Sequence, residues 1–202
     1  MLIADAQREL RSVYISGSVG QIVSGLVWAV SAALTTWSSP RSGILALLIG
    51  GFFIYPLTQL GLRALGGPAS LPAGNPMREL AIEVAIVGPL MLPLIGAATL
   101  YKAAWFYPAF MIAIGAHYLP FSFLYGMRQF IVLGAILITV GLLIGLYAPG
   151  PSTLGAWFTA GLLLVFGFLH RRIHPTQQSG VGRHEPPRAA RHPNADEVGP
   201  TI

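Results

Sequence analysis

Six long apolar segments alternate with short polar breaks along the chain. They span roughly 12–37, 44–64, 79–100, 104–126, 128–147 and 153–169. About 20 apolar residues in a helix cross the hydrocarbon core of a bilayer. The segments are continuously apolar rather than alternating, which excludes a transmembrane β-barrel. The pattern therefore predicts an all-α, polytopic membrane protein with six transmembrane helices.

Turn-forming residues mark most of the breaks between these segments. Ser38-Ser39-Pro40 ends the first, the stretch from Gly66 to Pro76 contains three prolines, and Pro149-Gly150-Pro151 precedes the sixth. Only Gly126-Met127-Arg128 separates the fourth segment from the fifth, which leaves a tight hairpin and a shared bent helix as alternatives. Within the third segment, Pro89 and Pro93 predict a bend, because proline removes a backbone hydrogen bond.

Composition agrees with a membrane protein and narrows the chemistry. Only 9% of the residues are charged and 54% are hydrophobic, whereas a soluble domain carries about 25% charged residues. The net charge of +5 comes from basic residues at segment ends and in the C-terminal region. Positive charge that sets membrane orientation explains them better than nucleic-acid binding, so no nucleic-acid partner is expected. The absence of cysteine excludes disulfides, thiolate nucleophiles and cysteine-ligated zinc.

The basic residues also predict an orientation. With six spans both termini share one side, and seven arginines lie near membrane ends on that side against two basic residues on the other. Because cytoplasmic loops carry an excess of lysine and arginine, both termini are expected in the cytoplasm, as in a multi-pass protein of the inner cell membrane. The first set is Arg8, Arg11, Arg63, Arg78, Arg128, Arg171 and Arg172; the second is Arg41 and Lys102.

Three regions follow from this pattern. Residues 1–11 form a short N-terminal interfacial segment, residues 12–169 the six-helix transmembrane domain, and residues 170–202 a basic, proline-rich cytoplasmic tail expected to be disordered. In this tail His170 and His174 are spaced as i and i+4 and could share a metal ion. A juxtamembrane basic patch beside anionic lipid is the favoured interpretation.

Common catalytic signatures are absent. The sequence has no P-loop, no H-E-x-x-H and no G-x-S-x-G motif. Glu83 is the one acidic residue within the spans, with Glu79 at the edge. We therefore assign no catalytic residues, no metal ligands and no cofactor.

Polar residues within the spans gather in the halves nearest the predicted cytoplasmic side. Polar groups in hydrocarbon usually face the bundle interior or a wet cavity, so this placement predicts a polar pocket that opens to the cytoplasm. The candidate pocket residues are Gln21, Tyr55, Gln59, Arg63, Glu83, His117, Tyr125 and Arg128.

Helical spacing relates some of these residues. Tyr55, Gln59 and Arg63 form one stripe at i, i+4 and i+8, and His117, Phe121 and Tyr125 form another.

For two of the candidates more than one interpretation is open. Glu83 either pairs with Arg63, Arg78 or Arg128, or extends to the interface. His117 makes either a helix–helix hydrogen bond or a contact that binds substrate or carries a proton.

Small residues supply faces for close packing. Gly141 and Gly145 form a G-x-x-x-G motif in the fifth span. Such motifs allow close backbone approach within one bundle or between subunits. The intramolecular use is favoured in a six-span protein, and homo-oligomer formation is left open.

Four stretches resemble a family of uncharacterised bacterial membrane proteins, the domain of unknown function numbered 7010. They are GSVGQIVSGLVW at 17–28, GGFFIYPLTQ at 50–59, PASLPAGNP at 68–76 and GAHYLPFSFLYGMRQ at 115–129. The resemblance covers about residues 5–148 and leaves out the sixth span and the tail. It implies a membrane topology and no assigned activity.

Three functions remain open at this stage. The first is binding or transport of a small molecule or lipid headgroup in the pocket, with the lipid bilayer as surroundings. The second is a structural or accessory membrane subunit, whose polar residues serve helix packing alone. The third, an intramembrane enzyme that uses His117 and Glu83 as acid and base, is the least favoured, because no nucleophile or metal set accompanies them.

Overall fold

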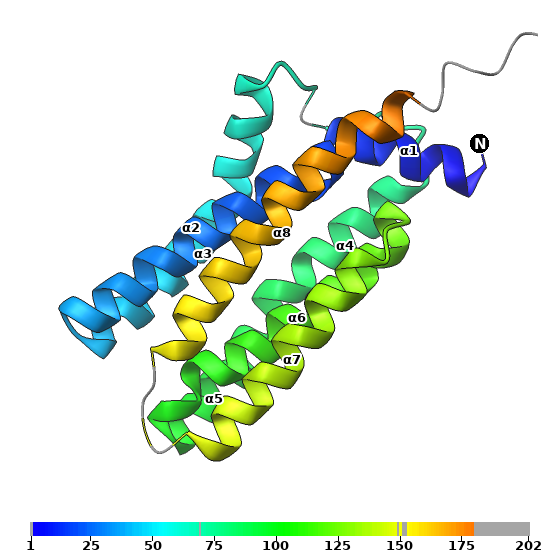
Figure 1. Cartoon of the computed structure of the whole chain (residues 1–202). Coiled ribbons are helices and arrows are strands. Elements are labelled where there is room, and N and C mark those ends of the chain that lie inside the picture. The colour runs from blue at the N-terminus through cyan, green and yellow to red at the C-terminus, as the bar shows by residue number, and fades with distance from the viewer. Residues whose placement is uncertain (1, 69, 149, 151–152, 180–202) are drawn as a thin grey trace, which may run out of the picture.

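The computed structural model describes residues 2–68, 70–148, 150 and 153–179, and within these ranges the regular structure is entirely helical (Figure 1). Six stretches of this part of the chain are long and apolar enough to cross a membrane, which confirms the predicted class. The α-helices are α1 (Ile3–Val13), α2 (Ser18–Trp37), α3 (Pro40–Ala64), α4 (Met77–Leu90), α5 (Leu92–Tyr101), α6 (Phe106–Tyr125), α7 (Gln129–Tyr147) and α8 (Leu154–Ser179), and the 3₁₀ turns are η1 (Ile15–Gly17) and η2 (Ala103–Trp105).

The breaks behave as the turn residues indicate. Helices α4 and α5 form one span that is interrupted at Met91, between Pro89 and Pro93, so the predicted bend is confirmed. Between α6 and α7 the chain makes a tight turn in which Gly126 has a φ of 64°. This left-handed conformation is easy for glycine, and it settles the alternative in favour of a hairpin.

The spans form two groups of three. Helix α2 packs along both α3 and α8, while α6 packs along α7 and also contacts α4 and α5. Figure 1 shows the two groups as neighbouring layers, α2, α3 and α8 in one and α4 to α7 in the other. Each layer is tightly packed within itself and contacts the other layer more sparsely, which leaves room for a cavity between them.

Glycine allows the closest helix contact in the second layer. A Cβ atom added to Gly115 of α6 would lie 2.8 Å from the carbonyl oxygen of Gly134 of α7. The G-x-x-x-G motif of α7 serves the same pair of helices, because a Cβ at Gly141 would lie 3.0 Å from the carbonyl oxygen of Pro108 on α6. The motif is therefore used inside this bundle.

The N-terminal segment does more than lie at an interface. Helix α1 buries Ala6, Leu10 and Val13 against the end of the bundle that also carries the α6–α7 turn. We call this the α1 end. Between α1 and α2, Ile15 and Ser16 have φ values of 48° and 54°. Because side-chain-bearing residues rarely adopt such values, this junction sets a sharp change of direction.

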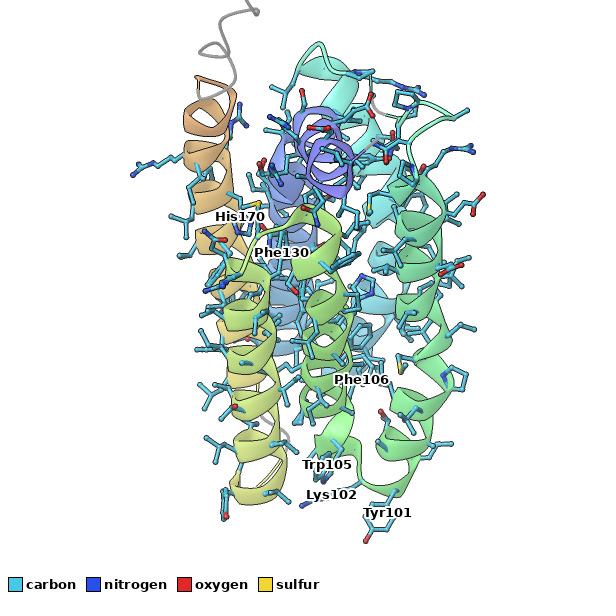
Figure 2. The ribbon with its side chains drawn as sticks, turned by 90° about the vertical axis from the view of Figure 1, so that its right-hand side faces the viewer. Tyr101, Lys102, Trp105, Phe106, Phe130 and His170 are labelled. Atoms are coloured by element: carbon cyan, nitrogen blue, oxygen red, sulfur yellow. The ribbon has the colours of Figure 1, made fainter. Side chains whose placement is uncertain are left out.

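The C-terminal boundary needs a correction. The expected tail begins at His170, whereas α8 continues to Ser179 and the His170 side chain is completely buried. His170 packs on Phe130 with 4.7 Å between ring centroids, near the α1 end of the molecule (Figure 2). Its partners make it a residue of the bundle interior. Residues 180–202, the rest of the expected tail, lie outside the described residues.

Candidate functional site

A cavity of about 410 Å³ lies between the two layers, within the membrane-spanning part of the molecule. Its wall is built mainly from α2 and α3 on one side and from α4 and α6 on the other. Single residues of α5, α7 and α8 complete it, and Leu10 of α1 closes it near the α1 end. Small residues help to make the space: a Cβ atom added at Gly51 of α3 would meet nothing within 4 Å.

Five of the eight residues chosen as candidates from the sequence line the cavity. They come from three helices, and each lies on the face of its helix that is turned toward the other layer. The five are Gln21 of α2, Tyr55 and Gln59 of α3, and His117 and Tyr125 of α6.

The three charged candidates lie elsewhere. Arg63, Glu83 and Arg128 do not line the cavity, and all three side chains are exposed. Glu83 makes no ion pair with any arginine, since the single ion pair among the described residues joins Arg8 to Asp5. Of the two alternatives for Glu83, the ion pair is therefore not formed among the described residues, and the side chain is exposed. The depth of a residue can be read from its position along the helix, but the side of the helix on which it lies depends on how the helix is rotated in the bundle.

Gln21 is held in the cavity wall by α8. Its Oε1 atom lies 2.7 Å from Nδ1 of His170. Because an amide oxygen can only accept, His170 donates from Nδ1. Among the described residues, the Nε2 atom of Gln21 is then left without a partner, and so is Nε2 of His170. One turn further along α2, Ser24 also lines the cavity, as does Tyr118 of α6.

His117 lies in the wall opposite Gln21. It lies on α6, lines the cavity and packs against Phe121 with 5.0 Å between ring centroids. Its Nδ1 atom is buried and has no hydrogen-bond partner in the structure. Gly88 of α4 leaves space beside the imidazole: a Cβ atom added there would lie 4.0 Å from Cε1 of His117.

Aromatic side chains close the cavity on the side away from α1. Trp28 contacts Phe110 edge to face, with 5.4 Å between ring centroids, and it also contacts Tyr107. The Tyr107 hydroxyl group lies 2.9 Å from Oγ of Ser31 and 2.5 Å from Oγ1 of Thr35. These hydrogen bonds connect α6 to α2, and so join the two layers on the side of the cavity away from α1. Trp105 and Phe106 lie further toward that end (Figure 2).

Helix α1 closes the opposite side. The Arg11 guanidinium group donates to the carbonyl oxygen of Tyr125, and Gln7 donates to that of Phe123, so two carbonyls in the last turn of α6 accept hydrogen bonds from α1. Burial, and after it the neighbouring Arg8, lowers the pKa of Arg11. Burial likewise raises the pKa of Tyr14, with Tyr55 as a further cause, so Tyr14 lines the cavity as a neutral phenol.

The exposed part of the lining lies between α3 and α4. Phe52 and Tyr55 of α3 are each 67% exposed, and Ala85 and Pro89 of α4 are exposed as well. All four lie well inside the spans Pro40–Ala64 and Met77–Tyr101 rather than at the ends of these spans. The mouth of the cavity therefore faces the side of the bundle, at a depth where hydrocarbon surrounds a membrane protein.

Two residues that shape the cavity were not among the candidates chosen from the sequence. Trp28 looks like ordinary apolar lining, and His170 comes after the last apolar run. A signal for His170 exists, because it continues the helical spacing of the buried positions of α8. Up to residue 173, where the described burial ends, these positions are Gly155, Ala156, Thr159, Ala160, Leu163, Gly167 and His170.

The wall of the cavity contains polar but no charged side chains. No Asp, Glu, Lys or Arg side chain lines the cavity. Within the described residues no three His, Cys, Asp or Glu side chains come together as a metal site. Glu83 does not share the cavity with His117, so the acid–base pair considered from the sequence is not assembled there.

Fold and site together define a multi-pass helical membrane protein with an internal, uncharged cavity. The chain belongs to DUF7010, a family of unknown function, whose model matches residues 3–172. The match confirms the resemblance and extends it through the sixth span, which had been expected to fall outside. No curated protein and no solved structure matches the chain.

Proposed function

We propose that the protein binds a small molecule or a lipid headgroup in its intramembrane cavity, as a binding protein or a carrier. The observation that carries this proposal is a cavity of about 410 Å³ whose wall contains Gln21, Gln59 and His117. Binding pockets for small molecules have volumes of about 300–1,000 Å³, and polar side chains inside membrane spans usually mark ligand or substrate paths. A ligand between the layers would contact both of them, which is the arrangement that a carrier needs.

The orientation of the cavity follows from the arginine distribution. With the α1 end in the cytoplasm of a cell whose inner membrane holds the protein, the cavity lies in the cytoplasmic half of the bilayer. Helix α1 covers that end, so a ligand reaches the cavity either past α1 or through the side between α3 and α4.

One observation favours a second candidate, the accessory subunit. Helices α3, α4 and α5 leave most of their apolar surface uncovered in the single chain. Either lipid or a partner protein would cover these faces. In that case the polar residues of the cavity would serve packing alone.

The chain contains no cysteine, so single cysteines can report on the cavity. Gln59→Cys places a thiol on the cavity wall, and N-ethylmaleimide, which crosses membranes, is the probe. We expect Gln59→Cys to react, and we expect the reaction to slow at least tenfold when Gly88→Leu fills the space beside His117. Gly161→Leu on α8 is the matched control, because a Cβ atom there meets nothing within 4 Å and Gly161 does not line the cavity.

A membrane-impermeant maleimide, applied from each side in turn, then distinguishes the two routes. Labelling from the α1 side indicates a water path past α1, and labelling by N-ethylmaleimide alone indicates access through the bilayer. Failure of Gln59→Cys to react with either reagent, while Ala73→Cys in the exposed α3–α4 loop reacts, would contradict the binding proposal and favour the accessory role.

A further inference from the structure

The lining of the cavity restricts the charge of its ligand. None of the side chains in the wall carries a charge. The arginine candidates Arg63 and Arg128 are exposed and do not line the cavity, and the Arg11 guanidinium group donates to the main-chain oxygen of Tyr125. An ion moved from water into such a wall loses its hydration without gaining a counter-charge, which is strongly unfavourable. A charged head, phosphate included, is therefore a poor match for the cavity.

The cavity is also polarised along its length. Polar side chains lie toward the α1 end, where Gln21, Gln59 and Tyr125 contribute to the wall. Farther from α1 the wall is apolar, with Trp28 and Phe110 at the closed side. A molecule with a polar head and a hydrocarbon body matches this gradient when its head lies toward α1.

Two buried polar atoms of the wall lack partners. They are Nε2 of Gln21, a residue that is only 2% exposed, and Nδ1 of His117. Unsatisfied buried donors and acceptors cost free energy, and a ligand oxygen that accepts from Gln21 would relieve one of them. Nδ1 of His117 donates or accepts according to its tautomer, so a hydroxyl or carbonyl oxygen suits both positions.

The mouth points to the bilayer as the source. Its rim consists of residues from the middle parts of two spans, among them Phe52 and Tyr55 of α3 and Pro89 near the α4–α5 break, and all three are exposed. A molecule dissolved in the hydrocarbon layer could enter there without passing α1.

We propose that the ligand is an uncharged, lipid-soluble molecule with an oxygen-bearing head, held between Gln21 and His117, and a hydrocarbon body that extends toward Trp28. This inference rests on the proposed binding function and names its ligand class. The chemistry is shared by long-chain alcohols and by lipid-soluble quinones, and the test separates these two sources.

Trp28 provides the reporter, because it lines the cavity and is 1% exposed. A protein that keeps only this tryptophan (W37F, W105F and W157F) is placed in nanodiscs of phosphatidylcholine. The matched control keeps only Trp37, which is 76% exposed and reports the surrounding bilayer. If the triple variant does not fold, the fluorescence difference between the unaltered protein and Trp28→Phe gives the same signal.

Three quenchers are added: dibrominated octadecanol, a decyl-substituted benzoquinone, and dibrominated octadecyl phosphate as the charged counterpart of the alcohol. We expect the alcohol or the quinone to quench Trp28 saturably, and the one that saturates identifies the source. The phosphate should quench Trp28 only in proportion to its mole fraction, as all three quenchers should for Trp37. Gly88→Leu should abolish the saturable part, and Gly161→Leu should preserve it.

Two results would overturn the inference. Saturable quenching by octadecyl phosphate, at the same or a lower mole fraction than the alcohol, would show that the cavity accepts a charged head. Proportional quenching of Trp28 by all three probes would show that none of them enters. In both cases the maleimide reaction at Gln59→Cys tests the proposed binding function independently. If Gly88→Leu still slows that reaction, the binding function is supported and only the proposed ligand class is wrong.

Discussion

Nδ1 of His170 lies 2.7 Å from Oε1 of Gln21, and this contact joins α8 to α2 inside the membrane-spanning bundle. Both residues are almost completely buried. The bond fixes which end of the Gln21 amide remains unpaired, because the oxygen is occupied and the nitrogen is not. Helix α8 thus sets the hydrogen-bonding character of the cavity wall, although His170 does not line the cavity.

This bond can be tested with a double-mutant cycle. We expect Gln21→Leu to lower the free energy of unfolding by about 1–3 kcal/mol, because it leaves the His170 donor buried and unsatisfied. His170→Leu should have a similar effect, and the double variant should lose less than the sum of the two. The coupling energy should be about 1 kcal/mol, the usual size for a hydrogen bond between membrane helices. Strictly additive effects, measured by unfolding in detergent mixtures, would show that the bond contributes nothing.

A second prediction concerns the docking of α1. Asn75 donates from Nδ2 to the carbonyl oxygen of Ala6 over 3.1 Å and to Oε2 of Glu9 over 2.7 Å, while its Oδ1 accepts from the amide of Met77. The α3–α4 loop therefore holds α1 over the cavity. Asn75→Asp keeps the acceptor for Met77 but loses both donors and faces Glu9 with a like charge. We expect trypsin to cleave at Arg8 several times faster in this variant.

The control for that experiment is Arg78→Gln, an exposed substitution close by that leaves the contacts of Asn75 intact. Cleavage at Arg8 should be unchanged in this control. Equal protection of α1 in Asn75→Asp and in the unaltered protein would mean that Arg11 and Gln7, which donate to the end of α6, hold α1 without help from the loop.

Much of the fold could be predicted because the physical signal is local. Continuous apolar runs fix the six spans, and Pro89 and Pro93 fix the bend at Met91. The site was only partly predictable. His117 and Glu83 look alike from their depth, yet one lines the cavity and the other is exposed. In a helix surrounded by lipid both faces are apolar, so the pattern does not reveal the rotation that separates them.

The docking of α1 was hidden for a different reason. Its buried positions Ala6, Leu10 and Val13 recur at helical spacing, and that spacing is equally typical of a helix lying on a membrane surface. The choice between the two depends on the distant residues Asn75 and Tyr125, whose positions only the tertiary structure supplies.

A third prediction addresses the close contact of α6 with α7. Gly115→Ala would place its Cβ atom 2.8 Å from the Gly134 carbonyl oxygen and 2.7 Å from Cγ1 of Ile138. We expect the helices to separate, with a loss of about 1–3 kcal/mol in the free energy of unfolding, as in other overpacked cores. Gly96→Ala on α5, where nothing lies within 4 Å, is the comparison and should be neutral or stabilising, because alanine favours helix more than glycine. A Gly115→Ala protein as stable as Gly96→Ala would argue against the observed packing.

The last prediction tests whether the ligand contacts only the cavity, or also the charged residues that the sequence selected by their depth in the membrane. Arg63→Gln and Arg128→Gln alter exposed side chains outside the cavity, so saturable quenching of Trp28 should occur at a mole fraction of probe within about twofold of the unaltered protein. His117→Leu removes a polar group from the wall itself, so at least fivefold more probe should be required. Unfolding measured in parallel separates lost binding from lost structure. If instead Arg128→Gln weakened quenching as much as His117→Leu does, the ligand would have to reach the α6–α7 turn, and an uncharged cavity would no longer describe the site.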